Sequence, residues 1–244
     1  MTELAIRPEL LGSLPETTQR QLRTYRDLLF RWNQRFNLTA IREPDEIDSR
    51  LIADALRLLP AIDEELDARN DRARLIDLGT GAGLPGLVIK IARPDIDMVL
   101  VDATNKKIQF VQHAITELGL LTASTVHSRA EDIGHHVDYR GQFDLITARG
   151  VAALPTLVEL TVPLLVVGGA FLFPKGEDIA DERRAGDEAA KIVGGRIDSA
   201  DLLPGDPSEP VTRLVRGIKI GPTPGRYPRR AGIPNKEPLG RDGQ

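Results

Sequence analysis

The stretch Arg74-Leu-Ile-Asp77-Leu-Gly79-Thr-Gly81-Ala-Gly83 decides the fold that this sequence predicts. Residues 74–78 are typical of a short buried strand. The glycines after it let the backbone turn sharply and approach a ligand, because glycine tolerates positive φ and has no Cβ. A second apolar run, residues 98–101, ends in Asp102, nineteen positions after Gly83. A carboxylate there can accept two hydrogen bonds from a ribose diol. The pair predicts a nucleoside-type cofactor lying across two adjacent parallel strands.

Two details beside the glycines choose between the cofactors that this pattern admits. The spacing Gly81-x-Gly83-x-x-Gly86 also fits a dinucleotide. Asp77, however, comes just before the first glycine, where its charge would repel a pyrophosphate but would face the cationic methionine end of S-adenosylmethionine. Pro85 can begin a helix but withholds a backbone N–H. The residues therefore favour a methyltransferase over a dinucleotide-binding protein, and both over a purely structural glycine turn.

Strand-like and helix-like segments alternate through residues 71–220. Such alternation predicts a doubly wound, mostly parallel α/β sheet, Rossmann-like and of the class I methyltransferase type. Residues 195–202 and 213–220 follow each other without a long helix between them, which favours an antiparallel hairpin at the sheet edge. The expected strands are residues 75–78, 98–101, 124–127, 143–147, 170–173 and 213–220, and the expected helices are residues 85–92, 106–118, 155–165 and 178–192.

Two segments flank this predicted cofactor-binding domain. Residues 1–70 are expected to form a helical extension packed on the core, with a second helix over residues 44–59 and a polar linker over residues 63–74. Residues 221–244 hold five prolines and five glycines, which predicts an extended tail rather than a folded element. The apolar residues at helical spacing in the first helix are Leu22, Tyr25, Leu28, Leu29, Trp32 and Phe36.

Composition excludes several classes of protein. The 244 residues are 41% hydrophobic and 28% charged, as in a globular protein that buries a core. The absence of cysteine excludes disulfides, thiolate metal sites and a cysteine nucleophile, and the four histidines show no metal-ligand spacing, so no metal is expected. No apolar run is long enough to span a bilayer and the start lacks the features of a signal peptide, so a cytoplasmic protein is expected.

Three further segments follow expected strands, at the sheet edge where α/β proteins bind ligands. Ala130 and Glu131 could cover the adenine ring and bind its exocyclic amine, or they could simply begin a helix with acids in its first turn. Arg149 is expected to point into the cleft and hold a phosphate or the cofactor carboxylate; the alternative is a surface arginine paired with a nearby acid. Lys175 follows the fifth strand and is a second candidate for positioning the substrate.

Basic side chains gather in two places although the net charge is −4. Both groups could contact phosphates of a nucleic acid, whereas the usual meaning of such spacing on a helix is a solvated face. An acid-free basic stretch in an acidic protein is more unusual, which favours the second group. The first group is Arg20, Arg23, Arg31 and Arg35 on the first helix, and the second is Arg226, Arg229, Arg230 and Lys236 in the tail.

Several motifs together resemble the bacterial small-subunit ribosomal RNA methyltransferase family also called glucose-inhibited division protein B. The block Arg-Trp-Asn-Gln-Arg-Phe-Asn-Leu-Thr at residues 31–39 and the loop Asp-Leu-Gly-Thr-Gly-Ala-Gly-Leu-Pro-Gly at residues 77–86 are its most specific parts. Residues 128–131, 148–149, 175–176 and 227–236 also match, so the resemblance covers nearly the whole chain. One departure is Leu-Ile-Ala-Asp-Ala at residues 51–55, where the family often has His-Ile-Leu-Asp-Ser.

The resemblance implies a function and a site. The family makes 7-methylguanosine in 16S ribosomal RNA with S-adenosylmethionine, and its partner is that RNA, free or in an assembling 30S particle; a monomer is expected. Gly79 and Leu84 would hold the cofactor, Ala130 and Glu131 its adenine end, and Arg149 its methionine end or the RNA. Together with the residues argued above, the expected cofactor site is Asp77, Gly79, Gly81, Gly83, Leu84, Asp102, Ala130, Glu131 and Arg149.

The chemistry of guanine suggests the mechanism. Its seventh ring nitrogen has a free lone pair and no proton, so direct in-line transfer of the methyl group needs no general base, and none is predicted. The site must align the reacting atoms and exclude water. The alternatives are a methyltransferase acting on another substrate and a module that binds the cofactor or RNA without turnover.

Overall fold

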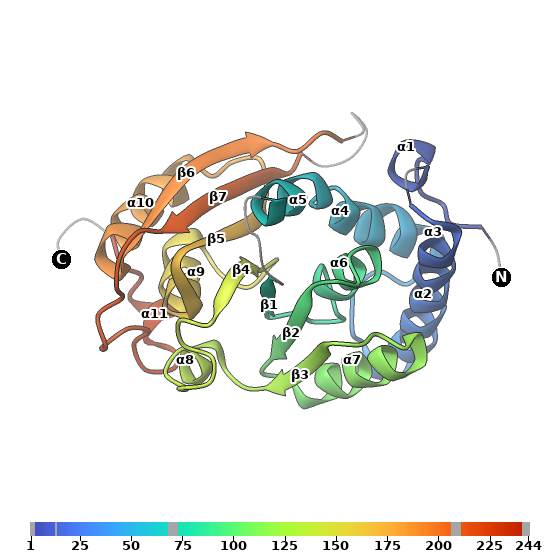
Figure 1. Ribbon diagram of the computed structural model, residues 1–244, viewed down its shortest axis with the longest axis horizontal. Helices are drawn as coiled ribbons and strands as arrows, with labels where there is room; N and C mark the ends of the chain where they lie inside the picture. The colour runs from blue at the N-terminus through green and yellow to red at the C-terminus, as the bar shows by residue number, and fades with distance from the viewer. Residues whose placement is uncertain (1–2, 13, 68–72, 206–210, 241–244) are drawn as a thin grey trace.

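The computed structural model describes residues 3–12, 14–67, 73–205 and 211–240, and in these ranges a seven-stranded sheet forms the centre of the molecule (Figure 1). The strand order is β3-β2-β1-β4-β5-β7-β6. Neighbours from β3 to β5 run parallel, whereas β7 lies antiparallel between β5 and β6. This confirms the expected fold class, including the antiparallel edge. The strands are β1 Arg74–Leu78, β2 Asp97–Asp102, β3 Ala123–His127, β4 Phe143–Thr147, β5 Leu165–Lys175, β6 Gly195–Leu202 and β7 Arg213–Lys219.

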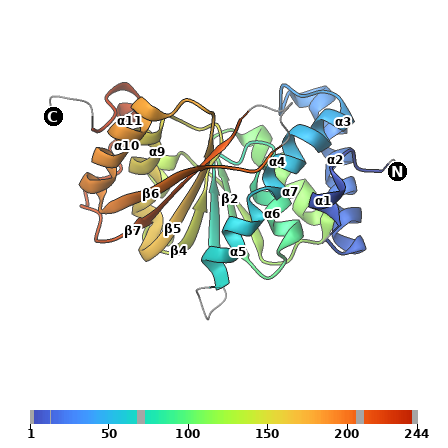
Figure 2. The same cartoon turned by 90° about the horizontal axis from the view of Figure 1, so that it is seen from above.

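Helices cover both faces of the sheet, and each face has its own hydrophobic core (Figure 2). Leu75 and Ile76 are neighbours on β1, yet they belong to different cores, because successive side chains of a strand point to opposite faces. One face is covered by α6 Gly86–Ala92, α7 Asn105–Leu118 and the N-terminal helices, and the other by α8 Ala130–Ile133, α9 Leu154–Thr161, a short 3-10 turn at Val162–Leu164 and α10 Ala180–Val193. Among the described helices, none is both long and apolar enough to cross a membrane.

The N-terminal helices pack on the core beside α6 and α7. They are α1 Pro8–Leu11, α2 Glu16–Phe36, α3 Pro44–Ile47, a π-helical turn at Asp48–Ile52, α4 Ala53–Leu56 and α5 Leu59–Asp67. The expected single helix over residues 44–59 is therefore divided. The expected polar linker is wrong for residues 63–67, because α5 buries Ala61, Ile62 and Leu66 on one side and leaves its acids on the other. Residues 68–72 lie outside the described ranges.

The apolar residues at helical spacing on α2 are not all buried. Leu22, Tyr25 and Leu29 are fully buried, but Phe36 at the end of the helix is 40% exposed. Beyond it, Asn37 ends the helix in the left-handed conformation with φ of 48°. Asn33 then holds the returning chain: its Nδ2 donates to the Ile41 carbonyl at 2.8 Å, and its Oδ1 accepts from the Thr39 amide at 2.9 Å. The asparagines of the block at residues 31–39 thus have a structural use.

The C-terminal segment, residues 221–240, differs most from its prediction. It is packed against α8, α9 and α10, and it contains a short helix, α11 Ile233–Lys236. Tyr227 and Leu239 are buried in the core on that side. Arg229 makes hydrogen bonds of 2.9 and 2.7 Å from its side chain to the fully buried carboxylate of Glu159. The expected extended tail is therefore wrong for residues 221–240, and residues 241–244 lie outside the described part.

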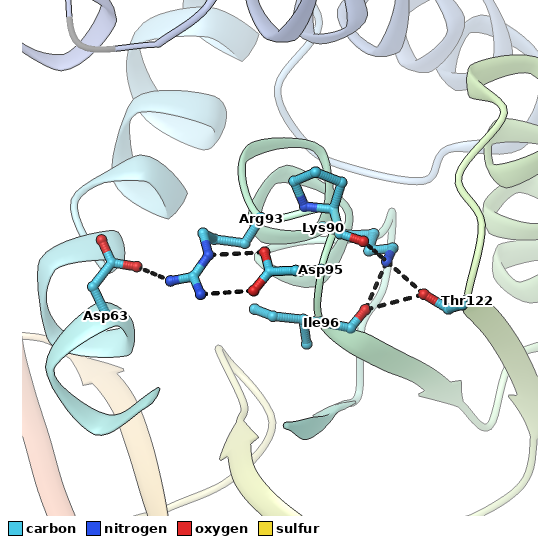
Figure 3. Close-up of polar contacts among 7 residues, drawn as sticks. Asp63, Lys90, Arg93, Asp95, Ile96 and Thr122 are labelled. Atoms are coloured by element: carbon cyan, nitrogen blue, oxygen red, sulfur yellow. Dashed lines mark hydrogen bonds and ion pairs between the residues drawn. The ribbon is translucent and has the colours of Figure 1, made fainter. Parts of the chain in front are cut away.

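A polar network lies at the edge of the sheet where the parallel strands begin, opposite the glycine loop (Figure 3). Lys90 is fully buried, and its Nζ donates to the Pro94 and Ile96 carbonyls at 2.8 and 2.6 Å and to Thr122 Oγ1 at 2.9 Å. Arg93 pairs with Asp95 at 2.8 Å and also with Asp63 of α5. These contacts tie α5 and α6 to the start of β2, and so they hold the first βα unit in place.

Candidate functional site

Two cavities lie at the carboxyl edge of the sheet, and Gly150 lines both. The first, of about 310 Å³, lies over β1, β2 and the start of α8, and we call it the nucleoside cavity. The second, of about 340 Å³, lies between α4, the ends of β4 and β5, and the chain that leads into β7, and we call it the acceptor cavity. Two neighbouring cavities of this size can hold two reacting molecules side by side.

Asp77 holds the glycine loop in place through hydrogen bonds to its carboxylate. Its side chain is fully buried, and its Oδ2 accepts hydrogen bonds from Thr80 Oγ1 at 2.6 Å and from the Gly86 amide at 3.0 Å. Its Oδ1 accepts from Thr147 Oγ1 on β4 at 3.0 Å. Burial raises the pKa of the Asp77 carboxyl above its usual range, while these hydrogen bonds oppose the rise. Both oxygens are thus engaged, one by the loop and one by β4, and Asp77 lines neither cavity.

Close packing requires glycine at two positions of this segment, Gly79 and Gly86. Gly79 has φ of +71°, and a Cβ there would lie 2.5 Å from Val151 Cγ2. A Cβ at Gly86 would lie 2.7 Å from Asp77 Oδ2, so any larger residue would push the carboxylate away from its donors. The loop is also held from outside, because the Tyr25 hydroxyl of α2 donates to the Ala82 carbonyl at 2.7 Å.

Asp102, at the end of β2, faces the nucleoside cavity as predicted. Its Oδ2 accepts from the Gly81 amide at 3.0 Å and its Oδ1 from the Thr104 amide at 2.8 Å. Lys107 Nζ lies 3.7 Å from Oδ2. A carboxylate oxygen has more than one lone pair, so each oxygen can still accept from a hydroxyl of a bound ribose.

The far end of the nucleoside cavity combines three separate segments of the chain. Ala130 and Glu131 begin α8, Leu160 comes from α9, and Asn235 comes from the C-terminal segment. Glu131 also anchors that segment, because its Oε1 accepts from the Gly232 amide at 3.0 Å. Glu131 therefore lies in the first turn of a helix and also lines the cavity.

Arg149 and Lys175 line the acceptor cavity. Arg149 NH1 lies 3.7 Å from Asp54 Oδ2 of α4, so this arginine is both directed into a cavity and close to an acid. Lys175 Nζ pairs with Glu182 Oε2 at 2.7 Å and donates to the Ala152 carbonyl at 3.1 Å. The positive charge of Lys175 is therefore shared with protein oxygens.

Five of the nine predicted cofactor residues line one of the two cavities, and four line neither. Gly79, Asp102, Ala130 and Glu131 line the nucleoside cavity and Arg149 lines the acceptor cavity, whereas Asp77, Gly81, Gly83 and Leu84 line neither. The sequence reasoning missed Lys107, Leu160 and Asn235, and nothing in their spacing could have revealed them. In the described ranges, no group of three His, Asp or Glu side chains is placed to hold a metal ion.

Comparison with known proteins places this architecture among methyltransferases. A family model described as rRNA small subunit methyltransferase G matches residues 18–202. The chain is 42% identical over 226 residues to the ribosomal RNA small subunit methyltransferase G of Chloroflexus aggregans, which covers 93% of this chain and 92% of that protein. It is 41% identical to the protein of the same name from Alkaliphilus oremlandii, with 90% of each chain covered.

Solved structures share the fold at low identity. The antibiotic-resistance methyltransferase Kmr has a TM-score of 0.52 and 19% identity, covering 66% of this chain and 92% of that one. A 16S rRNA (adenine(1408)-N(1))-methyltransferase from Catenulisporales acidiphilia has a TM-score of 0.51 and 17% identity, with the same two coverages, 66% and 92%. At this identity the likeness concerns the fold alone.

Proposed function

This chain belongs to the rRNA small subunit methyltransferase G family, and we propose that it transfers a methyl group from S-adenosylmethionine to a guanine of small-subunit ribosomal RNA, forming 7-methylguanosine. The observation that carries the proposal is the pair of cavities that meet at Gly150. One has the carboxylate and glycine loop that suit a nucleoside cofactor, and the other has charged side chains that suit a base.

The residues of the nucleoside cavity fit S-adenosylmethionine. Asp102 would accept hydrogen bonds from the ribose hydroxyls, and Ala130 and Glu131 would lie beside the adenine. Gly79 packs against Val151, which also lines the cavity, so a Cβ there would displace Val151 and change the shape of the cavity. The methionine end would extend toward Gly150 and Arg149, whose guanidinium suits the cofactor carboxylate. When bound, the cofactor supplies an electrophilic methyl group on a cationic sulfur.

The acceptor cavity offers a guanine a hydrogen-bonding partner. Asp54 lines it, and its Oδ1 already accepts from Arg57 NH1 at 3.1 Å. A carboxylate oxygen has more than one lone pair, so the Asp54 carboxylate could still accept from the ring N–H and the exocyclic amine of guanine. Pairing of that edge would leave the seventh ring nitrogen unpaired and free to attack. Since that nitrogen carries no proton, the residues need only orient the base and exclude water. Asp54 would also stabilise the cationic product electrostatically.

Exposed basic and aromatic side chains support an RNA substrate. Arg31 and Arg35 flank Trp32, Phe36 and His113 around an open groove of about 730 Å³ on α2 and α7. Aromatic rings that stack on bases, with arginines that contact phosphates, are typical of single-stranded nucleic-acid binding. In the C-terminal segment, Arg226, Arg230 and Lys236 are exposed, whereas Arg229 is engaged by Glu159.

The experiment that tests the proposal is methyl transfer from labelled cofactor to 16S ribosomal RNA and to 30S particles, followed by mapping of the modified nucleotide. We expect label on a single guanine and loss of transfer in Asp54→Ala, with Glu43→Ala, an exposed acid elsewhere, as the control. If the label appeared on a small molecule or on a protein and not on RNA, the proposed RNA substrate would be refuted. Cofactor binding without any transfer would reduce the protein to a binding module.

The C-terminal segment calls for point substitutions rather than deletion. Removing residues 222–244 would take away Asn235 and the partner of Glu131, so it would damage the nucleoside cavity as well as any RNA contact. The double variant Arg226→Glu/Arg230→Glu reverses two exposed charges and leaves Asn235 and Glu131 in place, although it also removes the Arg226 guanidinium from above the Tyr227 ring. We expect it to weaken RNA binding and its salt dependence while cofactor affinity is kept.

A further inference from the structure

The C-terminal segment brings one polar side chain into the nucleoside cavity. Asn235 lies on α11 and lines the cavity together with Ala130, Glu131 and Leu160. It is more than a hundred residues away in sequence from Glu131. Its presence there depends wholly on how the segment folds back over the sheet edge.

The backbone that leads to Asn235 is fixed by contacts with α8 and α9. Before α11, Gly232 donates its amide to Glu131 Oε1 at 3.0 Å, and Arg229 is bound to Glu159. Within α11, the Pro234 carbonyl accepts from the buried Thr156 hydroxyl at 2.8 Å. The residue next to Asn235 is therefore tied to α9, and the helix start is tied to α8. Because this backbone is anchored, the Asn235 side chain is held at the cavity.

The chemistry of the asparagine side chain suits an adenine ring. Its amide offers one acceptor and a donor group two bonds away, and adenine presents an amine beside an accepting ring nitrogen, so the two can form a bidentate pair. Among the residues that the structure describes, none hydrogen-bonds to the Asn235 side chain. Glu131 nearby has one carboxylate oxygen already engaged by Gly232. Asn235 is thus a neutral group that can both donate to and accept from a neutral base, whereas the Ser128 hydroxyl in the same cavity already donates to the Arg129 carbonyl.

We propose that Asn235 recognises the adenine base of S-adenosylmethionine, its Oδ1 accepting from the 6-amino group and its Nδ2 donating to the neighbouring ring nitrogen. This rests on the proposed function, which places the adenine beside Ala130 and Glu131. The C-terminal segment would then be part of the cofactor site, and the discrimination among nucleosides would come from a residue outside the alternating strands and helices of the domain.

The test compares two ligands on three proteins. The ligands are S-adenosylhomocysteine and its analogue with hydrogen in place of the 6-amino group, and the affinities are measured by titration calorimetry. The proteins are the wild type, Asn235→Ala and Lys236→Ala. Asn235 and Lys236 are adjacent and exposed on α11, but Lys236 does not line the cavity. Truncation of either exposed side chain leaves the anchors of the segment unchanged.

We expect the wild type and Lys236→Ala to prefer the amino compound, and Asn235→Ala to lose about tenfold or more of that preference, the scale of a bidentate amide–adenine pair. An unchanged preference in Asn235→Ala would overturn the proposal. An equal loss for both ligands would also overturn it, since the residue would then only shape the cavity. Failure of the wild type to bind either ligand would instead refute the proposed cofactor site.

Discussion

The role of Asp77 as the centre of the glycine loop leads to a prediction about two substitutions. In Asp77→Ala, the Gly86 amide and the hydroxyls of Thr80 and Thr147 all lose their acceptor in a buried place. An unsatisfied buried polar group costs about 1–3 kcal/mol. The three groups together therefore lower the free energy of unfolding by roughly 3–6 kcal/mol, allowing for some rotation of the hydroxyls.

Asp77→Asn should behave differently. The amide oxygen can take the place of Oδ2 and accept from Thr80 and Gly86, while the amide nitrogen donates to Thr147 Oγ1, whose hydroxyl can turn and accept. All three contacts are kept, so we expect a loss of about 1 kcal/mol or less, within the range of a single neutral hydrogen bond. Cofactor affinity should fall sharply in the alanine variant and little in the asparagine variant.

The free energy of unfolding of the wild type and of Asp77→Asn should depend differently on pH. Burial raises the pKa of the Asp77 carboxyl above the usual 3.8 of an aspartate, so the folded state holds this proton at pH values where the unfolded state has lost it. The free energy of unfolding of the wild type therefore falls as the pH rises from about 3.8 to the folded pKa, and it levels off above. Asp77→Asn lacks this change, so its stability relative to the wild type should improve across that window.

Urea unfolding followed by circular dichroism at several pH values measures both effects, and titration with S-adenosylmethionine measures the loop. If Asp77→Asn proved as unstable as Asp77→Ala at neutral pH, the negative charge itself would be indispensable, and the reasoning from satisfied donors would be refuted. Equal cofactor affinity in all three proteins would show that the loop does not depend on this carboxylate.

Three further substitutions test buried groups, two of them beside the site and one, Lys219, beside the start of β5. Gly86→Ala should destabilise by about 1–3 kcal/mol in urea unfolding, because its Cβ would lie 2.7 Å from Asp77 Oδ2. Glu159→Gln should cost about 3 kcal/mol by the same assay and weaken cofactor binding, because it breaks a buried ion pair with Arg229. Burial lowers the pKa of Lys219 to about 8, so the wild type should gain stability from pH 8 toward pH 10, and Lys219→Met should not.

Each of these has a control or a contrary outcome. Gly225→Ala, at a glycine with no atoms within 4 Å of the added Cβ, should be neutral. The double variant Glu159→Gln/Arg229→Gln should recover part of the loss, and a purely additive result would mean that the pair does not couple. A rise in stability with pH that persists in Lys219→Met would assign the effect to another group.

The first βα unit could be predicted almost completely from local sequence. The strand at residues 74–78, the glycine turn and Asp102 are close in the chain, and parallel pairing of β1 with β2 brings them to one edge. The hairpin of β6 and β7 also followed from two strands without a helix between them. Apolar alternation and glycine spacing are local properties, and the backbone has few ways to satisfy them.

Other features depended on contacts that no local pattern reports. The acids of α5 suggested a linker, yet Ala61, Ile62 and Leu66 were enough to bury the helix against the core. The prolines of residues 221–240 suggested an extended tail, yet Glu159 binds Arg229 and fixes the segment on α9. A buried carboxylate requires a partner, and its partner lies seventy residues away.

The sequence by itself determined the fold class, the family and the position of the glycine loop, because these follow from short-range periodicity and from motifs of fixed spacing. Only the tertiary structure decided which of those residues face a cavity. It turned Asp77 inward to hold the loop, left Asp102 facing the nucleoside cavity, and brought Asn235 to the same cavity as Glu131. Side-chain direction and long-range proximity are set by packing and by the pairing of buried charges, and these exist only once the chain has folded.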